Sequence, residues 1–162
     1  FDTGIKIGKR LTDRVDVEGG YTFDYRNGQN APSARPEAVS SGAVFDMDGH
    51  TGSVLSNVLL TNSLLLSLGY SFRHGDVTSV CNGAVVATIV DKIDAVTRDL
   101  AFDESLCAYR IRGNTHKFSV GATYALGNRS SVNVNYTRRE GEARGLDYSN
   151  NLVNVSFNYS FQ

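Results

Sequence analysis

The chain has 162 residues, enough for one domain, and its 41% hydrophobic and 20% charged residues exclude a disordered or fibrous protein. The net charge of −1 gives no electrostatic basis for binding nucleic acid. No apolar run approaches the roughly 18–20 residues of a membrane-spanning helix.

The chain begins with a hairpin in which apolar and polar residues alternate. Residues 1–11 and 15–25 form the two alternating runs, and residues 12–14 form the turn. Because successive side chains of a strand point to opposite faces, one face collects apolar residues and the other collects charges. The apolar set is Phe1, Ile5, Ile7, Leu11, Val15, Val17, Tyr21, Phe23 and Tyr25. The polar set is Asp2, Lys6, Arg10, Asp16, Glu18 and Asp24.

Two further hairpins, over residues 49–77 and 114–142, repeat this layout. In all three, a Leu before the turn lies ten residues from a Tyr after it: Leu11/Tyr21, Leu60/Tyr70 and Leu126/Tyr136. The last run, residues 151–161, alternates in the same way. Three matches in frame indicate repeated β-hairpins of equal length. We therefore expect about seven strands of roughly ten to fourteen residues.

Three longer connections, at about residues 27–48, 75–113 and 140–149, alternate with the short turns. The middle connection is too long for a simple loop and should carry structure of its own. Its residues at helical spacing predict a short amphipathic helix: Val86, Ile89, Val90, Ile93, Val96 and Leu100. Alternatively, residues 83–90 form an eighth strand.

The two cysteines, Cys81 and Cys107, both lie in the middle connection. They are too far apart for a CxxC metal or redox motif, so we favour a disulfide that closes the segment between them. Such a disulfide implies an oxidising compartment. Two unrelated buried thiols are the alternative.

The length and period of the strands predict an antiparallel up-and-down transmembrane β-barrel. Soluble strands average about 5–6 residues, whereas membrane-crossing strands need about 9–11. Short turns that alternate with long connections are typical of outer-membrane barrels. A soluble sheet whose apolar face packs inward is the alternative. Its polar face would be freely solvated, whereas the Gly, Ser, Thr and Asn here suit a crowded interior.

In the barrel interpretation, the polar face lines the lumen and the apolar face contacts lipid. The expected lumen-facing charges are Lys6, Arg10, Asp16, Glu18, Asp24, Arg73 and Lys117. Aromatic girdles are expected at both edges of the apolar band, from Phe23, Tyr25 and Phe72 at one edge and from Tyr124 and Tyr159 at the other.

With its three hairpins and the terminal "VSFNYSF", the chain resembles bacterial outer-membrane β-barrel proteins of the porin-like class. The resemblance implies a Gram-negative outer membrane as the location and lipid as the surroundings. It also implies recognition by the barrel-assembly machinery, with Phe161 as the signal aromatic. Gln162 departs from that pattern, because proteins of this class characteristically end on the aromatic residue.

Seven strands are an odd number, whereas bacterial single-chain barrels have even numbers. We therefore expect the chain to be the C-terminal part of a longer barrel, or one whose remaining strands come from elsewhere. The eighth strand at residues 83–90 is again the alternative. The whole chain, residues 1–162, is then one barrel domain or barrel segment with a long extracellular loop at about residues 75–113.

The histidines and nearby aspartates are the only candidates for chemistry. His50 and His74 lie symmetrically about the second turn, so they should be cross-strand neighbours, near Asp46, Asp48 and Asp76. An Asp–His pair at the rim of a barrel resembles the arrangement of omptin-type proteases. His116 occupies the repeat position of His50, which favours an interfacial role for both. We expect no enzyme activity, no metal and no cofactor.

These observations predict a pore or membrane scaffold, through which solutes would diffuse past lumen charges. The alternative is a binding module, in which the barrel anchors a disulfide-stapled extracellular loop for a protein partner. An omptin-like hydrolase is a distant third. No nucleic-acid partner is expected.

Overall fold

The computed structural model describes residues 1–28, 42–82, 91–98 and 106–160, with residues 42, 43, 81, 82, 97, 98 and 106 described by their backbone alone. The elements in chain order are β1 (Asp2–Thr12), β2 (Val15–Arg26), α1 (Gly42–Phe45), β3 (Met47–Thr61), β4 (Leu64–Asn82), β5 (Ala95–Arg98), β6 (Leu106–Ala125), β7 (Ser130–Ala143) and β8 (Leu146–Tyr159). The fold is therefore an all-β antiparallel up-and-down sheet.

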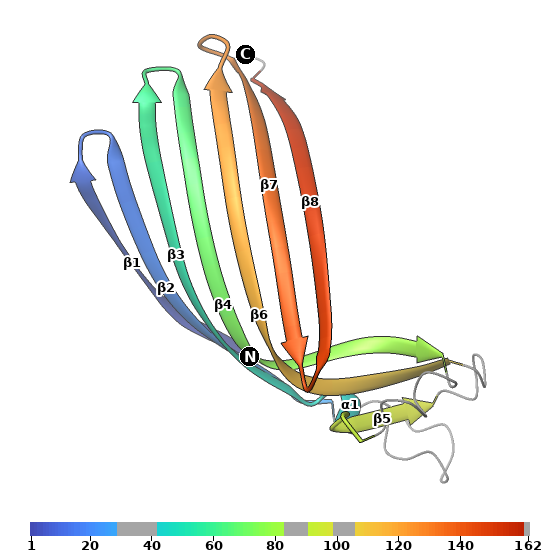
Figure 1. The fold of residues 1–162 in the computed structure, drawn as a ribbon. Coiled ribbons are helices and arrows are strands. Elements are labelled where there is room, and N and C mark those ends of the chain that lie inside the picture. The colour runs from blue at the N-terminus through green and yellow to red at the C-terminus, as the bar shows by residue number, and fades with distance from the viewer. Residues whose placement is uncertain (29–41, 83–90, 99–105, 161–162) are drawn as a thin grey trace.

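Seven long strands lie side by side in the order β1-β2-β3-β4-β6-β7-β8, and the short β5 pairs with β6 (Figure 1). Each long strand is antiparallel to its neighbours, as alternating runs joined by tight turns require. The predicted number of long strands is confirmed. Because seven is odd, β1 and β8 run in the same direction.

The register confirms the positions of the short turns. Thr12 pairs with Val15 and Thr61 pairs with Leu64, which leaves two residues in each turn. The third short connection joins β6 to β7 and covers residues 126–129. All three lie at the same end of the sheet (Figure 1). The Leu-to-Tyr spacing therefore indicated the correct hairpins.

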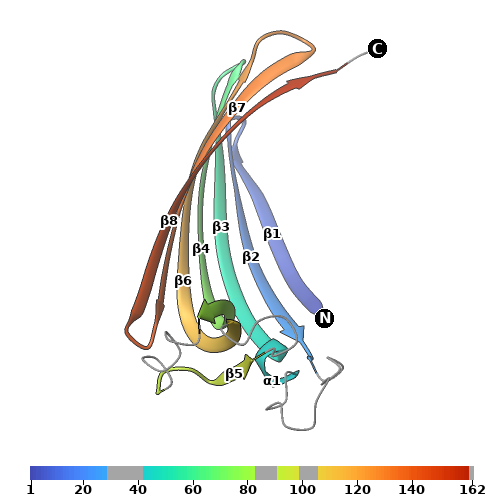
Figure 2. The same cartoon turned by 90° about the vertical axis from the view of Figure 1, so that its right-hand side faces the viewer.

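The sheet is twisted and open, with β1 and β8 as its two edge strands (Figure 2). One face carries the apolar set and the other the polar set, as the alternation predicts. Both faces are largely exposed. Large hydrophobic residues such as Ile7, Leu68, Val155 and Phe157 remain half exposed or more.

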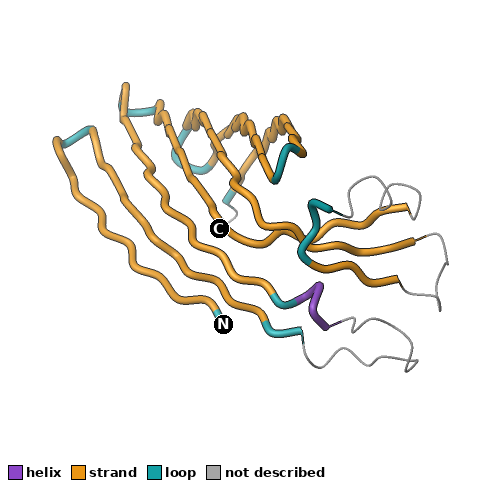
Figure 3. The backbone as a smooth tube through the Cα atoms, turned by 60° about the horizontal axis from the view of Figure 1, so that its bottom comes forward, coloured by secondary structure: helices purple, strands orange, loops and turns teal. Residues whose placement is uncertain are grey.

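β4 and β6 continue past the other strands, although the sequence predicted a loop from residue 75 to 113. Gly49, Gly75 and Gly113 pair in one row across β3, β4 and β6. A Cβ at Gly75 or Gly113 would collide with the neighbouring backbone, so only glycine allows this close approach. Beyond the row, β4 and β6 leave their other neighbours and turn away together (Figures 1 and 3).

The turned-away part forms a small unit that we call the end cap: α1, β5, residues 76–82 of β4 and residues 106–112 of β6. In it, β5 takes the place beside β6 that β7 holds further along. The hydrophobic residues buried among those described all lie here, namely Val44, Cys107 and Ile111. Ile93, Val96 and Tyr109 pack against Cys107. The end cap thus holds the only hydrophobic core in the described part of the chain.

The predicted helix is wrong where it can be examined, because residues 91–98 form a turn and β5. Ile93 and Val96 pack on the core from this extended segment, and β-branched residues favour such a surface. The candidate eighth strand at residues 83–90 lies outside the described residues.

The predicted loop at residues 140–149 is also wrong. β7 runs to Ala143 and β8 begins at Leu146, so Arg144 and Gly145 alone form the turn. Both have positive φ, 49° and 75°, which is a type I′ turn that matches the twist of the strands. Arginine seldom adopts this conformation, so the sequence had Gly145 here but not the Asn-Gly or Asp-Gly pair that is typical of such turns. In the first connection, α1 and the start of β3 replace the end of the predicted loop.

Candidate functional site

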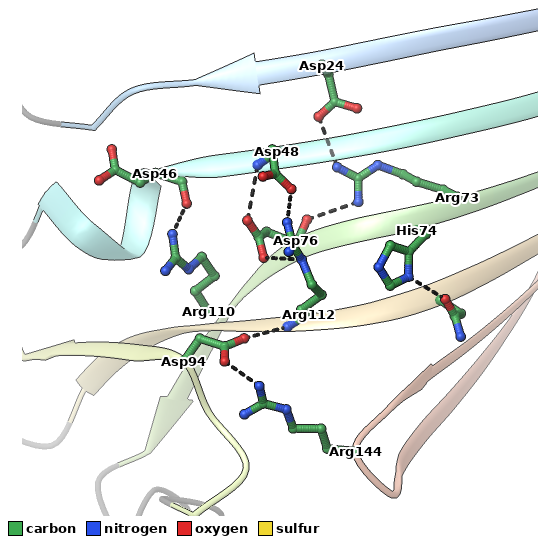
Figure 4. Close-up of polar contacts among 11 residues, drawn as sticks. Asp24, Asp46, Asp48, Arg73, His74, Asp76, Asp94, Arg110, Arg112 and Arg144 are labelled. Carbon is green, nitrogen blue, oxygen red and sulfur yellow. Dashed lines mark hydrogen bonds and ion pairs between the residues drawn. The ribbon is translucent and has the colours of Figure 1, made fainter.

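The end cap is fastened to the long strands by a network of arginines and aspartates (Figure 4). Arg112 on β6 pairs with Asp48 on β3 and with Asp76 on β4, where Nε lies 3.4 Å from Oδ1. Asp76 is only 8% exposed, and it also accepts a hydrogen bond of 3.1 Å from the backbone N–H of Asp48. A buried carboxylate needs such partners, because desolvation would otherwise destabilise its charge.

The hydrogen bond to Asp48 raises the pKa of Arg112 above its ordinary value, and burial opposes this effect. The charges of Asp76, Asp48 and Asp94 add to the increase. The raised pKa keeps Arg112 cationic at any pH at which the protein would work. This cation is therefore a permanent link between β3, β4 and β6.

A second link joins the end cap to the β7–β8 turn. Asp94, just before β5, accepts a hydrogen bond of 2.9 Å from the backbone N–H of Arg112. It also pairs with Arg144 at 2.6 Å, and Arg144 donates to the carbonyl of Lys92 at 3.1 Å. On the other side, Arg110 donates to the carbonyl of Asp46. The end cap is thus held between the β2–β3 connection and the β7–β8 turn.

Arg73 connects the network to the polar face of the sheet. Its Nη2 pairs with Asp24 on β2 at 2.9 Å, and its Nη1 donates to the carbonyl of Asp76 at 3.0 Å. The Arg73 and Asp24 side chains are only 24% and 20% exposed, so solvent screens this pair less than a surface pair. Both residues were predicted to face one interior, and the structure brings them together.

The other predicted lumen charges lie on the same polar face but form fewer ion pairs, and the pair that they do form is exposed. Lys6 and Glu18 form an exposed ion pair at 3.3 Å. Asp16 accepts a hydrogen bond of 2.9 Å from Asn57. Within the described residues, Arg10 and Lys117 form no ion pair. Whether this face lines a lumen remains a prediction.

Neutral side chains cross-link the rest of the polar face. Ser67 donates to Asn57 at 2.7 Å, and Asn133 donates to Thr123 at the same distance. Such cross-strand bonds stabilise neighbouring strands without burying charge. They explain why small polar residues recur at these positions.

Near the β7–β8 turn, a tyrosine ring packs over a glycine on the polar face. Tyr148 on β8 faces Gly141 on β7, which faces Thr115 on β6. The ring of Tyr148 lies where a side chain at Gly141 would be, and its hydroxyl is 3.1 Å from Oγ1 of Thr115. The ring therefore spans three strands, and only glycine leaves room for it.

The predicted girdle aromatics lie on the apolar face. Tyr124 and Tyr159 are half exposed at the end with the short turns, and Tyr25 is exposed at the other end. Phe23 and Phe72 also lie at that other end, where each packs against a histidine ring at 5.0 Å. The two groups stand at opposite ends of the strands, as expected, but their contact with an interface remains a prediction.

Within the described residues, the hydrogen-bond partners of the three histidines are not aspartates. The predicted pairing of His50 with His74 across β3 and β4 is confirmed. However, Nδ1 of His74 bonds the Asn114 side chain at 2.8 Å, and the other two histidines bond tyrosines. In the described part of the chain, no group of three His, Cys, Asp or Glu side chains is arranged to hold a metal.

The strand register places the two cysteines opposite each other, but the structure does not describe both side chains. Cys81 lies directly opposite Cys107 on β4 and β6. Opposite residues of antiparallel strands have Cα atoms about 4.5–5.5 Å apart, within the range of a disulfide. The side chain of Cys81 lies outside the described residues, and so does Phe161, so both predictions remain untested.

Sequence reasoning missed four residues of the network: Asp94, Arg110, Arg112 and Arg144. They lie in regions predicted as loops, where no alternation of apolar and polar residues was recognised to assign side chains to a face. No sequence pattern singled them out, because the pairing of Gly75 with Gly113, which continues the β4–β6 register into the end cap, is seen only in the structure.

Comparison of the chain with protein-family models, with curated proteins and with solved structures found no significant match. Among the described residues, no helix is both long and apolar enough to cross a membrane.

Proposed function

We propose that the chain forms part of the wall of a transmembrane β-barrel in a bacterial outer membrane. The apolar face would contact lipid, and the polar face would line the interior of a pore or scaffold. The observation that carries the proposal is the exposed apolar face of a sheet on which the described residues pack no second layer.

The accessible surface supports this reading. Large hydrophobic residues of this face remain exposed, with Ile7 at 69%, Val155 at 66% and Phe157 at 63%. Apolar surface buried from water contributes about 25 cal/mol per Å². A soluble sheet would therefore cover its apolar face with a second layer, and the described residues provide no such layer. Lipid would cover this face without one.

Strand direction limits how such a barrel could close. β1 and β8 run the same way, so their direct union would be a parallel pair. A second copy placed around the same axis would again bring β8 beside a parallel β1. Antiparallel closure needs an odd number of additional strands, which gives the even total of known single-chain barrels. We therefore favour a barrel larger than these seven long strands.

The end cap lies at the end of the sheet opposite the short turns (Figure 2). Short turns face the periplasm in outer-membrane barrels, so the end cap would face outward. Its ion pairs hold it near the Arg73–Asp24 pair, where it would narrow the entrance. A pore of this kind would select solutes by size and by charge at that constriction.

A binding module is the second candidate, and the end cap is the feature that favours it. It has its own small core and is fastened on two sides, as a recognition surface for a protein partner requires. In that case the barrel would serve only as the anchor.

Conductance of the complete gene product in planar bilayers tests the two candidates. A pore predicts discrete channels, and Asp94→Asn, which releases the Arg144 link, should increase their conductance or the frequency of opening. Glu140→Gln, in an exposed ion pair with Arg138 on the outer face of the sheet, is the matched control. Folded protein that resists alkaline extraction from membranes but forms no channels would support the anchor. Protein that is released by alkaline extraction would refute both.

A further inference from the structure

Three tyrosines on the apolar face repeat one hydrogen bond. Tyr21 bonds Nδ1 of His50 at 2.6 Å, Tyr70 bonds Nδ1 of His116 at 2.9 Å, and Tyr136 donates to Oδ1 of Asn151 at 2.8 Å. In each case the partner lies two residues before the residue that faces the tyrosine. The tyrosines are 46%, 40% and 41% exposed. We call these six residues the tyrosine row.

The two histidine units have the same geometry. The ring centroids of Tyr21 and His50 are 6.1 Å apart with a tilt of 31°, and those of Tyr70 and His116 are 6.2 Å apart with a tilt of 30°. A phenylalanine packs on each histidine at 5.0 Å. Two equal clusters on neighbouring hairpins indicate a role that depends on position in the sheet.

The hydrogen bond decides which ring nitrogen of each histidine is available. We assign the tyrosine as the donor to Nδ1, because a phenol O–H is a better donor than an imidazole N–H; this assignment places the proton of the ring on Nε2. Within the described residues, Nε2 of His50 and of His116 has no protein acceptor. Each unit therefore presents one N–H donor on the outer, exposed face of the sheet.

The row separates two kinds of surface. Towards the short turns, the strands carry apolar residues such as Val120, Leu66 and Val155 on this face. Towards the end cap, the same face of β6 and β7 carries the facing polar residues Asn114 and Glu142. The row is thus the boundary at which an apolar band ends.

The height of that band matches a hydrocarbon layer. His50 lies ten residues from Leu60, and His116 lies ten residues from Leu126, at the short turns. At about 3.4 Å per residue the band measures about 34 Å along a strand. With the roughly 40° tilt of barrel strands, its height is about 26 Å, close to the roughly 25 Å of outer-membrane barrels.

We propose that the tyrosine row binds the phosphate groups of lipid headgroups, through Nε2–H of His50 and His116. The inference rests on the proposed membrane location and assigns a specific contact to it. The two donors are on β3 and β6, with β4 between them, and His116 faces Phe72, two residues along β4 from the His74 that faces His50. Their Cα atoms are therefore about 12 Å apart, so the two donors would contact neighbouring lipids.

Dipolar recoupling between ¹⁵N-labelled histidine and ³¹P tests the contact in the complete protein, folded into phosphatidylglycerol vesicles. We expect phosphorus to attenuate two Nε2 signals, with nitrogen shifts that show protonated Nε2 and unprotonated Nδ1. His50→Phe/His116→Phe keeps aromatic packing and should remove the effect. Ser56→Ala, in the middle of the apolar band, should leave it unchanged.

Vesicles of a phosphate-free galactolipid provide the second measurement. The wild-type protein should unfold at a lower urea concentration in galactolipid than in phosphatidylglycerol, and this difference should shrink in the double variant. Inserted protein whose histidines show no phosphorus contact would overturn the inference and leave the membrane location intact. Protein that inserts into neither vesicle would overturn the membrane location as well.

Discussion

The Gly141–Tyr148 pair gives the sharpest test of the polar face. A methyl group at Gly141 would occupy the space of the Tyr148 ring, which bridges to Thr115 at 3.1 Å. Gly141→Ala therefore forces the ring away from β7. Gly19, on β2, is the matched control, because a Cβ there meets no atom within 4 Å.

The expected magnitude follows from the contacts that the ring would lose. Loss of the hydroxyl bond to Thr115 costs about 0.5–1.5 kcal/mol, and an off-rotamer ring costs about as much again. Both substitutions gain about 0.4–1 kcal/mol from a stiffer unfolded chain, and this gain cancels in the comparison. Gly141→Ala should therefore be less stable than Gly19→Ala by about 1–3 kcal/mol.

Urea unfolding of the protein in detergent micelles or vesicles, followed by tyrosine fluorescence and circular dichroism, measures the difference. The double variant Gly141→Ala/Tyr148→Ala completes a mutant cycle. If the ring is the cause, Gly141→Ala should cost little in the Tyr148→Ala background. An equal cost in both backgrounds, or equal stability of Gly141→Ala and Gly19→Ala, would show that the ring does not occupy this space.

Two further predictions concern the end cap. Alkylation of the denatured, unreduced protein should label neither Cys81 nor Cys107, and mass spectrometry of two labelled thiols would contradict the pairing read from the register. Asp94→Asn should speed amide hydrogen exchange in β5 several-fold, because it loses the ion pair to Arg144, while the long strands keep their protection. Glu18→Gln should leave exchange in β5 unchanged, since exposed pairs contribute about 0–1 kcal/mol. Equal effects of the two variants would argue that the Asp94–Arg144 pair does not hold β5 in place.

The alternation of side chains was sufficient to predict the long strands and their partners. A period of two assigns every residue to a face, and the ten-residue spacing of Leu and Tyr defines the hairpins. The facing of His50 and His74 followed from symmetry about one turn, and the register confirms it. The common polar face of Asp24 and Arg73 followed in the same way.

The sequence was less informative at the end opposite the short turns. The type I′ turn contains Arg144, a residue type that seldom adopts positive φ, so a loop was predicted instead. Ile93 and Val96 fit helical spacing, yet Ile93 lies just before β5 and Val96 lies in it. Short apolar segments are ambiguous in this way, because the choice between helix and strand depends on the partner they pack against.

The sequence by itself thus determined the strands of the three predicted hairpins, the face that each of their side chains takes and the position of their three short turns. These properties are local, since they depend on neighbours along the chain and across one hairpin. Only the tertiary structure decided the end cap, because it depends on contacts between distant segments. Gly75 and Gly113 must align with Gly49 on a third strand before β6 can exchange β7 for β5. Arg112 then meets carboxylates from three separate segments, a coincidence that no local pattern encodes.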